Sequence, residues 1–206
     1  MFQWHAASIA TLMGLLAISS ASAQQGPSTT IDSFRGLAWG SDGAMVVEAF
    51  GEPEQDEILD GGLRMLAFRD SLAGQPSLVL FGILPEVGLV KGQEIVTALE
   101  GQECIDQIRR IHLFVDLQYP LIRPTEEARN NTADMICEAT KLGDGYWHRQ
   151  WIDEPNGSVI SVRLDAGSSQ INLIFESLRF REWISAPVEV EPDESAAAAE
   201  AIGRSP

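Results

Sequence analysis

The sequence is poor in positive charge, in cysteine and in long apolar runs. Its 206 residues include 14 Lys and Arg against 30 Asp and Glu, which gives a formal charge of -16. A nucleic-acid binder needs a basic face to neutralise phosphates, and a protein held on anionic lipid needs a basic patch. The charge balance therefore argues against both classes, and we expect no nucleic-acid partner.

Catalytic and metal-binding signatures are also scarce. The two cysteines are too few for a disulfide scaffold or a cysteine-based zinc site. The chain contains no G-x-S-x-G, P-loop, H-E-x-x-H or dinucleotide-binding motif, and no D-x-[DN]-x-[DN]-G calcium loop. We therefore expect no metal, no cofactor and a non-catalytic protein; a hydrolase with scattered acid–base residues is the alternative.

A short apolar stretch lies at the N-terminus. Residues 6–18 are mostly apolar, and Ala21-Ser22-Ala23 is a small-x-small cleavage site, as in a secretory signal peptide cut before Gln24. The segment lacks Lys and Arg, so a buried N-terminal helix is the alternative. The stretch is too short to span a bilayer, and we expect no transmembrane segment. The prediction is a periplasmic or secreted protein.

The rest of the chain divides into a linker, a domain and a tail. We expect a linker at residues 24–33 and the folded domain at 34–184. Residues 185–206 carry five acids, one Arg and four successive alanines. Low apolar content and excess charge are typical of a disordered tail.

The first half of the domain begins with a predicted short helix. Ser41 can cap this helix, and Gly51 and Pro53 end it after Phe50. Its apolar stripe comprises Met45, Val46, Ala49 and Phe50. Alternating segments then predict an antiparallel meander at 57–60, 63–69, 77–84 and 88–97, with Gly61-Gly62 as a tight hairpin turn.

The second half repeats this order. A helix is predicted over 103–118, because apolar residues recur there at helical spacing. They are Cys104, Ile108, Ile111, Val115 and Tyr119. A further helix is expected from Thr125 or Thr132 to Leu142. Strands are then predicted at 145–153, 158–165 and 169–176.

The two halves suggest repeats at 34–97 and 103–184. The predicted fold class is α+β, with tandem helix-plus-antiparallel-meander units and helices packed on one face of an antiparallel sheet.

The start of the domain carries a distinctive series of residues. Residues 34–41 read Phe-Arg-Gly-Leu-Ala-Trp-Gly-Ser, and Val46-Val47 and Phe50-Gly51-Glu52-Pro53 follow. The series resembles the start of the small lipoproteins of outer-membrane protein assembly. It is also similar to envelope proteins whose helix-plus-meander unit resembles the fold of the β-lactamase inhibitor protein. The resemblance implies a fold and no reaction, and the chain lacks the lipidated cysteine of the assembly lipoproteins.

Cys104 and Cys137 both fall in the part predicted to be exported. An oxidising compartment favours a disulfide between them. Two buried thiols are one alternative. The other is a nucleophilic Cys104 with His112 as its base, two turns further along the same helix.

A candidate binding strip lies in the run of residues 146–151, Tyr-Trp-His-Arg-Gln-Trp. On a strand, Trp147, Arg149 and Trp151 share one face. Trp and Arg are enriched at interface hot spots, so the strip is our candidate binding surface. The alternative is that both Trp rings pack under helices, while Arg149 extends to the rim.

Other polar residues have local interpretations. His148 with Asp153 or Glu154 suggests acid–base chemistry, but an exposed strand histidine fits the alternation better. Asp residues beside Gly or turns are expected to stabilise the backbone rather than bind calcium: Asp60, Asp144, Asp153 and Asp165. Asn130 and Asn156 match N-glycosylation sequons.

These observations predict an exported envelope module that binds a protein or peptide partner through its sheet face. A purely structural envelope component is a further alternative. The sequence leaves the oligomeric state open.

Overall fold

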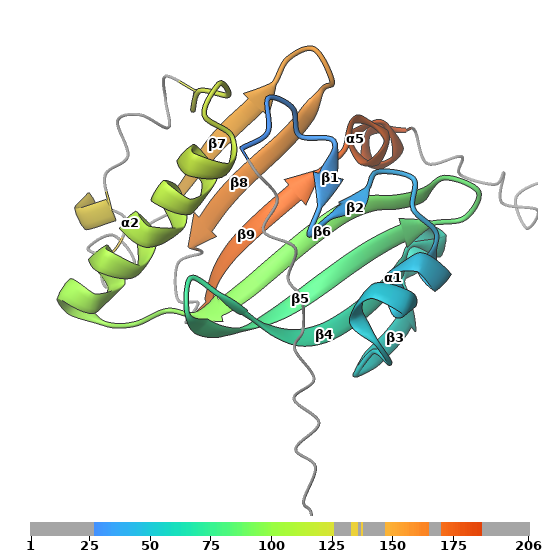
Figure 1. Ribbon diagram of the computed structural model, residues 1–206, viewed down its shortest axis with the longest axis horizontal. Coiled ribbons are helices and arrows are strands. Elements are labelled where there is room, and N and C mark those ends of the chain that lie inside the picture. Colours follow the sequence, from blue (N-terminus) through green and yellow to red (C-terminus); the bar gives the residue numbers. More distant parts are fainter. Residues whose placement is uncertain (1–26, 126–132, 136, 138–146, 165–169, 187–206) are drawn as a thin grey trace, which may run out of the picture.

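The computed structural model describes residues 27–125, 133–135, 137, 147–164 and 170–186. A seven-stranded antiparallel sheet has the order β3-β4-β5-β6-β9-β8-β7, and a small hairpin, β1-β2, lies beside it (Figure 1). The strands are β1 (Ser33–Phe34), β2 (Leu37–Ala38), β3 (Gln55–Ile58), β4 (Arg64–Leu72), β5 (Gln75–Leu84), β6 (Gly88–Thr97), β7 (Trp147–Asp153), β8 (Ser158–Leu164) and β9 (Gln170–Glu176). The described helices are α1 (Gly43–Phe50), α2 (Gly101–Gln118) and α5 (Leu178–Ser185).

Two helix-plus-meander units build this sheet. Helix α1 precedes the meander β3 to β6, and α2 precedes the meander β7 to β9. Strands β6 and β9 pair from Lys91↔Glu176 to Thr97↔Gln170, which joins the two meanders edge to edge. The predicted α+β class with tandem units is therefore confirmed.

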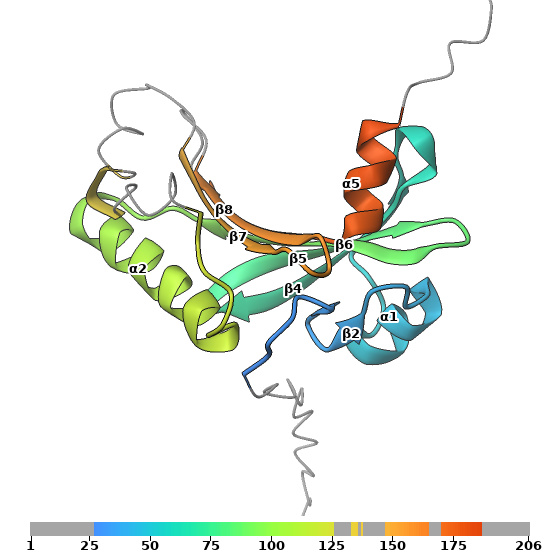
Figure 2. The same cartoon turned by 90° about the horizontal axis from the view of Figure 1, so that it is seen from above.

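Helices α1 and α2 cover one face of the sheet, with the N-terminal segment between them, whereas α5 lies on the opposite face (Figure 2). The sequence analysis did not predict α5. Its cap is Ser177, whose hydroxyl accepts a hydrogen bond from the Phe180 N–H at 3.2 Å. Phe180 and Trp183 pack against a small apolar cluster, which consists of Leu63, Leu84, Val90 and Met65.

Helix α1 differs in detail from the prediction. Its cap is Asp42, whose carboxylate accepts from the Met45 N–H at 2.8 Å; Ser41 is buried instead. Of the expected apolar stripe, Val46 is fully buried and Phe50 packs against the core, but Met45 is exposed. The helix contacts the sheet with a narrower face because it covers only one corner of it (Figure 1).

The distinctive series at the domain start forms the β1-β2 hairpin. Arg35 (φ 52°) and Gly36 (φ 86°) make the turn, and the Arg35 guanidinium donates two 2.7 Å bonds to the buried Glu94 carboxylate. A Cβ at Gly92 would overlap the Phe34 ring, so only glycine admits this close packing. The series therefore attaches the N-terminal segment to strand β6.

Part of the predicted linker packs against the domain. The Ser28 N–H donates to the Gln118 carbonyl at the end of α2 (2.7 Å). Ile31 is fully buried, and its N–H donates to the Asp153 carboxylate at 2.7 Å. An isolated Ile among polar residues carries no periodic signal, so the sequence pattern missed this anchor.

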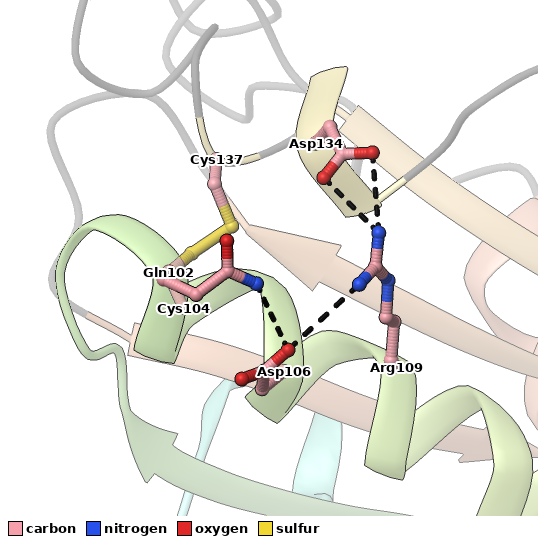
Figure 3. A network of polar contacts seen from close by, with 6 residues as sticks. All are labelled: Gln102, Cys104, Asp106, Arg109, Asp134 and Cys137. Carbon is pink, nitrogen blue, oxygen red and sulfur yellow. Dashed lines mark hydrogen bonds and ion pairs between the residues drawn. A yellow bond between two sulfur atoms is a disulfide. The ribbon is translucent and has the colours of Figure 1, made fainter.

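Helix α2 confirms the predicted helix, and every member of its predicted apolar stripe is buried. A disulfide joins Cys104 to Cys137, as predicted (Figure 3). The Arg109 side chain spans the same region, 3.2 Å from Asp134 and 3.8 Å from Asp106. The disulfide and the ion pair together hold residues 133–135 and 137 against α2.

The turns between the strands of the first meander differ in part from those predicted. Residues Asp60–Gly62 form a 3₁₀ turn rather than a tight two-residue hairpin. The β4-β5 hairpin runs further than predicted and turns at Ala73-Gly74. Other predictions lie outside the described residues: the signal peptide, nearly all of the tail, most of the helix ending at Leu142, Asn130, Asp144 and Asp165.

Candidate functional site

The predicted strip on β7 faces α2 and not the open side of the sheet. Arg149 lies opposite Val162 in the β-ladder, and Trp151 lies opposite Ile160; both partners belong to the core on the helix side. Trp151 is itself 0% exposed. It therefore occupies the core position held as the alternative in the sequence analysis. The Trp147 side chain is outside the described part of the structure.

Arg149 connects the strand to α2 through a polar cluster. Its Nη1 lies 3.2 Å from Nδ1 of His112, and its guanidinium carbon lies 5.1 Å from the centre of the Trp151 ring. Asp116 accepts a 2.9 Å hydrogen bond from the Trp151 indole N–H, and its other oxygen lies 4.0 Å from Arg149 Nη2. The side chain of Arg149 keeps 21% of its area exposed, as expected for an Arg that extends to the rim.

His112 is held neutral in this cluster. Burial and the positive charge of Arg149 lower the pKa of His112 to about 3. Because a guanidinium only donates, Nδ1 must accept the bond from Arg149, which places the imidazole proton on Nε2. Nε2 is buried and has no hydrogen-bond partner among the described residues. Because Arg149 occupies the Nδ1 lone pair and the pKa is lowered to about 3, His112 is a weak base and is poorly placed to take a proton from a substrate.

A cavity of about 530 Å³ opens beside Arg149, at the C-terminal end of α2. It is lined by Asp116, Tyr119, Pro120, Ile122, Arg123, Pro124 and Arg149. The chain after α2 forms its outer wall, because Pro124 bridges to Trp151 and the Thr125 N–H donates to the Gln150 carbonyl at 3.0 Å. Burial raises the pKa of Tyr119 to about 12, so this residue is a neutral phenol.

Other candidate residues have structural roles. Cys104 is disulfide-bonded, so it is not a free thiol nucleophile beside His112. Asp153 is buried at the end of β7, where its carboxylate accepts hydrogen bonds from the Asn156 amide at 2.9 Å and from the Ile31 N–H at 2.7 Å. The search of the described residues found no group of three or more His, Cys, Asp or Glu able to hold a metal ion.

The second candidate surface is the sheet face opposite α1 and α2, beyond the part that α5 covers. We call it the open face and define it by Leu78, Leu80, Gln93, Ile95, Gln150 and Arg163, which alternate with core residues on their strands. All six side chains are half-buried. Hydrogen bonds cross the face between strands, as in the 2.9 Å bond from Gln93 to Asn172.

The open face differs in charge from the rest of the chain. Lys91 and Arg163 point to this side by register, and Glu176 is the one carboxylate that the described strands β5, β6, β7, β8 and β9 present there. On these five strands the described residues of this side therefore include one carboxylate, in a chain of net charge -16, and Glu57 of the edge strand β3 lies on the same side by register.

The fold is that of an α+β protein with tandem helix-plus-meander units. Comparisons with protein-family models, with curated proteins and with solved structures find no match to the chain. Its function must therefore be inferred from its own surfaces.

Sequence reasoning missed most of these residues. Asp116 and Arg123 lie far in sequence from Arg149, and no spacing motif links the three. The residues of the open face could have been grouped from the sequence, because Leu78, Leu80 and Ile95 follow the period of two of a strand. The pattern alone did not show which of the two faces the helices cover.

Proposed function

We propose that this chain is an exported, non-catalytic binding module that holds a protein or peptide partner of the cell envelope on its open face. One observation carries the proposal. Among the described elements, α1 and α2 cover one side of the seven-stranded sheet, and α5 lies at one end of the other side (Figure 2). That other side presents half-buried aliphatic residues among polar ones. Interfaces commonly combine an apolar centre with a polar rim.

The charge of the face indicates the kind of partner. Arg163 lies beside its apolar centre, whereas Lys91 and Glu176 lie toward α5, where Lys91 packs 4.9 Å from the centre of the Phe180 ring. Electrostatic complementarity favours a partner surface that is neutral or acidic, and it disfavours a basic one. Binding of an acidic partner should therefore weaken as the salt concentration rises.

Export is supported by two features. A disulfide between Cys104 and Cys137 is typical of an oxidising compartment, and residues 1–23 have the pattern of a signal peptide. No helix in the described part of the chain is long and apolar enough to cross a membrane. The disulfide and the N-terminal pattern together favour a location in the periplasm or outside the cell.

Matched variants test the binding surface. Tagged wild-type protein and Leu80→Arg are used to capture partners from cell-envelope extract, with Ile58→Arg as the control on the exposed edge strand β3. We expect a partner band that Leu80→Arg loses and Ile58→Arg keeps, while circular dichroism of all three proteins stays the same. A band that survives Leu80→Arg, or that both variants lose, contradicts binding at the open face.

A further inference from the structure

The cavity beside Arg149 lies on the helix side of the sheet, away from the open face, and has its own chemistry. Its walls combine apolar surface from Tyr119, Pro120 and Ile122 with the charged groups of Asp116 and Arg149. Its volume of about 530 Å³ is within the range of small-molecule sites. The cavity is open on one side and can therefore hold a ligand with both an apolar body and a charged group.

Arg149 brings unused hydrogen-bonding capacity to this cavity. A guanidinium can donate from each of its nitrogens. In the described structure only Nη1 has a partner within hydrogen-bond distance, the Nδ1 of His112. Nη2 is 4.0 Å from the Asp116 carboxylate, and Nε is buried with no partner among the described residues. Because Nε is buried from solvent, Nη2 is the Arg149 donor that remains for an acceptor in the cavity, and it has no partner within hydrogen-bond distance among the described residues.

Arg123 supplies a second cation on the wall of the cavity. It is exposed, and the described residues provide it with no hydrogen-bond or ion-pair partner. The residues that line the cavity therefore contribute two guanidinium groups and one carboxylate, and Asp32 lies near enough to raise the pKa of Tyr119. Asp116 is itself engaged by the Trp151 indole, which leaves the guanidinium groups as the main recognition elements.

We propose that this cavity binds a carboxylate carried on an apolar body, such as a hydrophobic organic acid or the C-terminus of a peptide. Arg149 and Arg123 donate to the carboxylate, and Tyr119, Pro120 and Ile122 contact the apolar part. Planar guanidinium groups match carboxylate geometry through paired hydrogen bonds. The site is independent of the partner surface proposed above.

Calorimetry with defined probes tests the site on the full mature chain. The probes are 3-phenylpropionate and an acetylated Ala-Ala-Phe peptide with a free carboxylate, each paired with its primary amide, together with inorganic phosphate. We expect the carboxylates to bind and the amides not to bind. The stronger of the two acids identifies the source of the carboxylate.

Two Arg variants separate local recognition from overall charge. Arg123→Gln should weaken binding of the carboxylate about tenfold or more, because it removes an unpaired donor without disturbing the cluster around Arg149. Arg110→Gln, which removes the same charge from an exposed site on α2, should change binding little. Equal binding of acid and amide, equal loss in both variants, preference for phosphate, or no binding of either acid at millimolar concentration would overturn the proposal.

Discussion

Replacement of Trp151 measures directly whether the β7 strip belongs to the core. The side chain is 0% exposed, its ring packs 5.7 Å from the centre of the His112 ring, and its indole N–H donates to Asp116 at 2.9 Å. Trp151→Ala removes all of these contacts and should lower the free energy of unfolding by about 3–5 kcal/mol. Trp151→Phe keeps the aromatic packing but loses the hydrogen bond of the indole N–H, and it should lower the free energy of unfolding by about 1–2 kcal/mol.

Equilibrium urea unfolding of the oxidised protein, followed by circular dichroism, provides both values. We expect wild type to be the most stable, Trp151→Phe to be intermediate and Trp151→Ala to be the least stable, with a similar dependence of the unfolding free energy on urea concentration. Thermal melting should give the same order, with the Ala variant roughly 10 °C below wild type. A loss below about 1 kcal/mol for Trp151→Ala would refute the core position.

Further predictions concern the disulfide, pH and export. Denatured, unreduced protein should contain no free thiol, and Cys104→Ser with Cys137→Ser should cost about 3–4 kcal/mol, given the sequence separation of 33; two reactive thiols would contradict the bridge. The unfolded chain protonates His112 near pH 6.5, whereas the folded protein keeps it neutral down to about pH 3. The free energy of unfolding should therefore fall as pH drops through this window, by up to about 1.4 kcal/mol per pH unit, and this slope should flatten in His112→Gln; an unchanged slope refutes the shift. Mass spectrometry of exported protein should find Gln24 as the first residue, and an intact leader at residues 1–23 contradicts cleavage.

Local periodicity predicted much of the fold. Helix α2 was identified because Cys104, Ile108 and Val115 recur on one helical face, and the strands of both meanders because apolar and polar residues alternate. Helix α5 was missed because eight residues present too short a pattern, although Ser177 before Phe180 was an available capping signal. Contacts across the chain, such as Ile31 to Asp153, have no local signature.

The candidate sites depended on information that the sequence does not carry locally. Alternation correctly placed Arg149 and Trp151 on one face of β7, but only the ladder and α2 show that this face is buried. A one-residue shift of register would reverse the faces, so the same pattern fits an interface and a core. The cavity likewise exists only because the turn after α2 brings Arg123 near β7.

The most direct test of the proposed function is photo-crosslinking in intact cells. A photoreactive phenylalanine analogue is placed at Leu80, at Ile95 and, as the exposed control, at Ile58. Binding through the open face predicts a discrete crosslinked species from Leu80 and Ile95 and none from Ile58. Absence of a species at both open-face positions, in exported and folded protein, would contradict a partner on this face, as would equal crosslinking at Ile58.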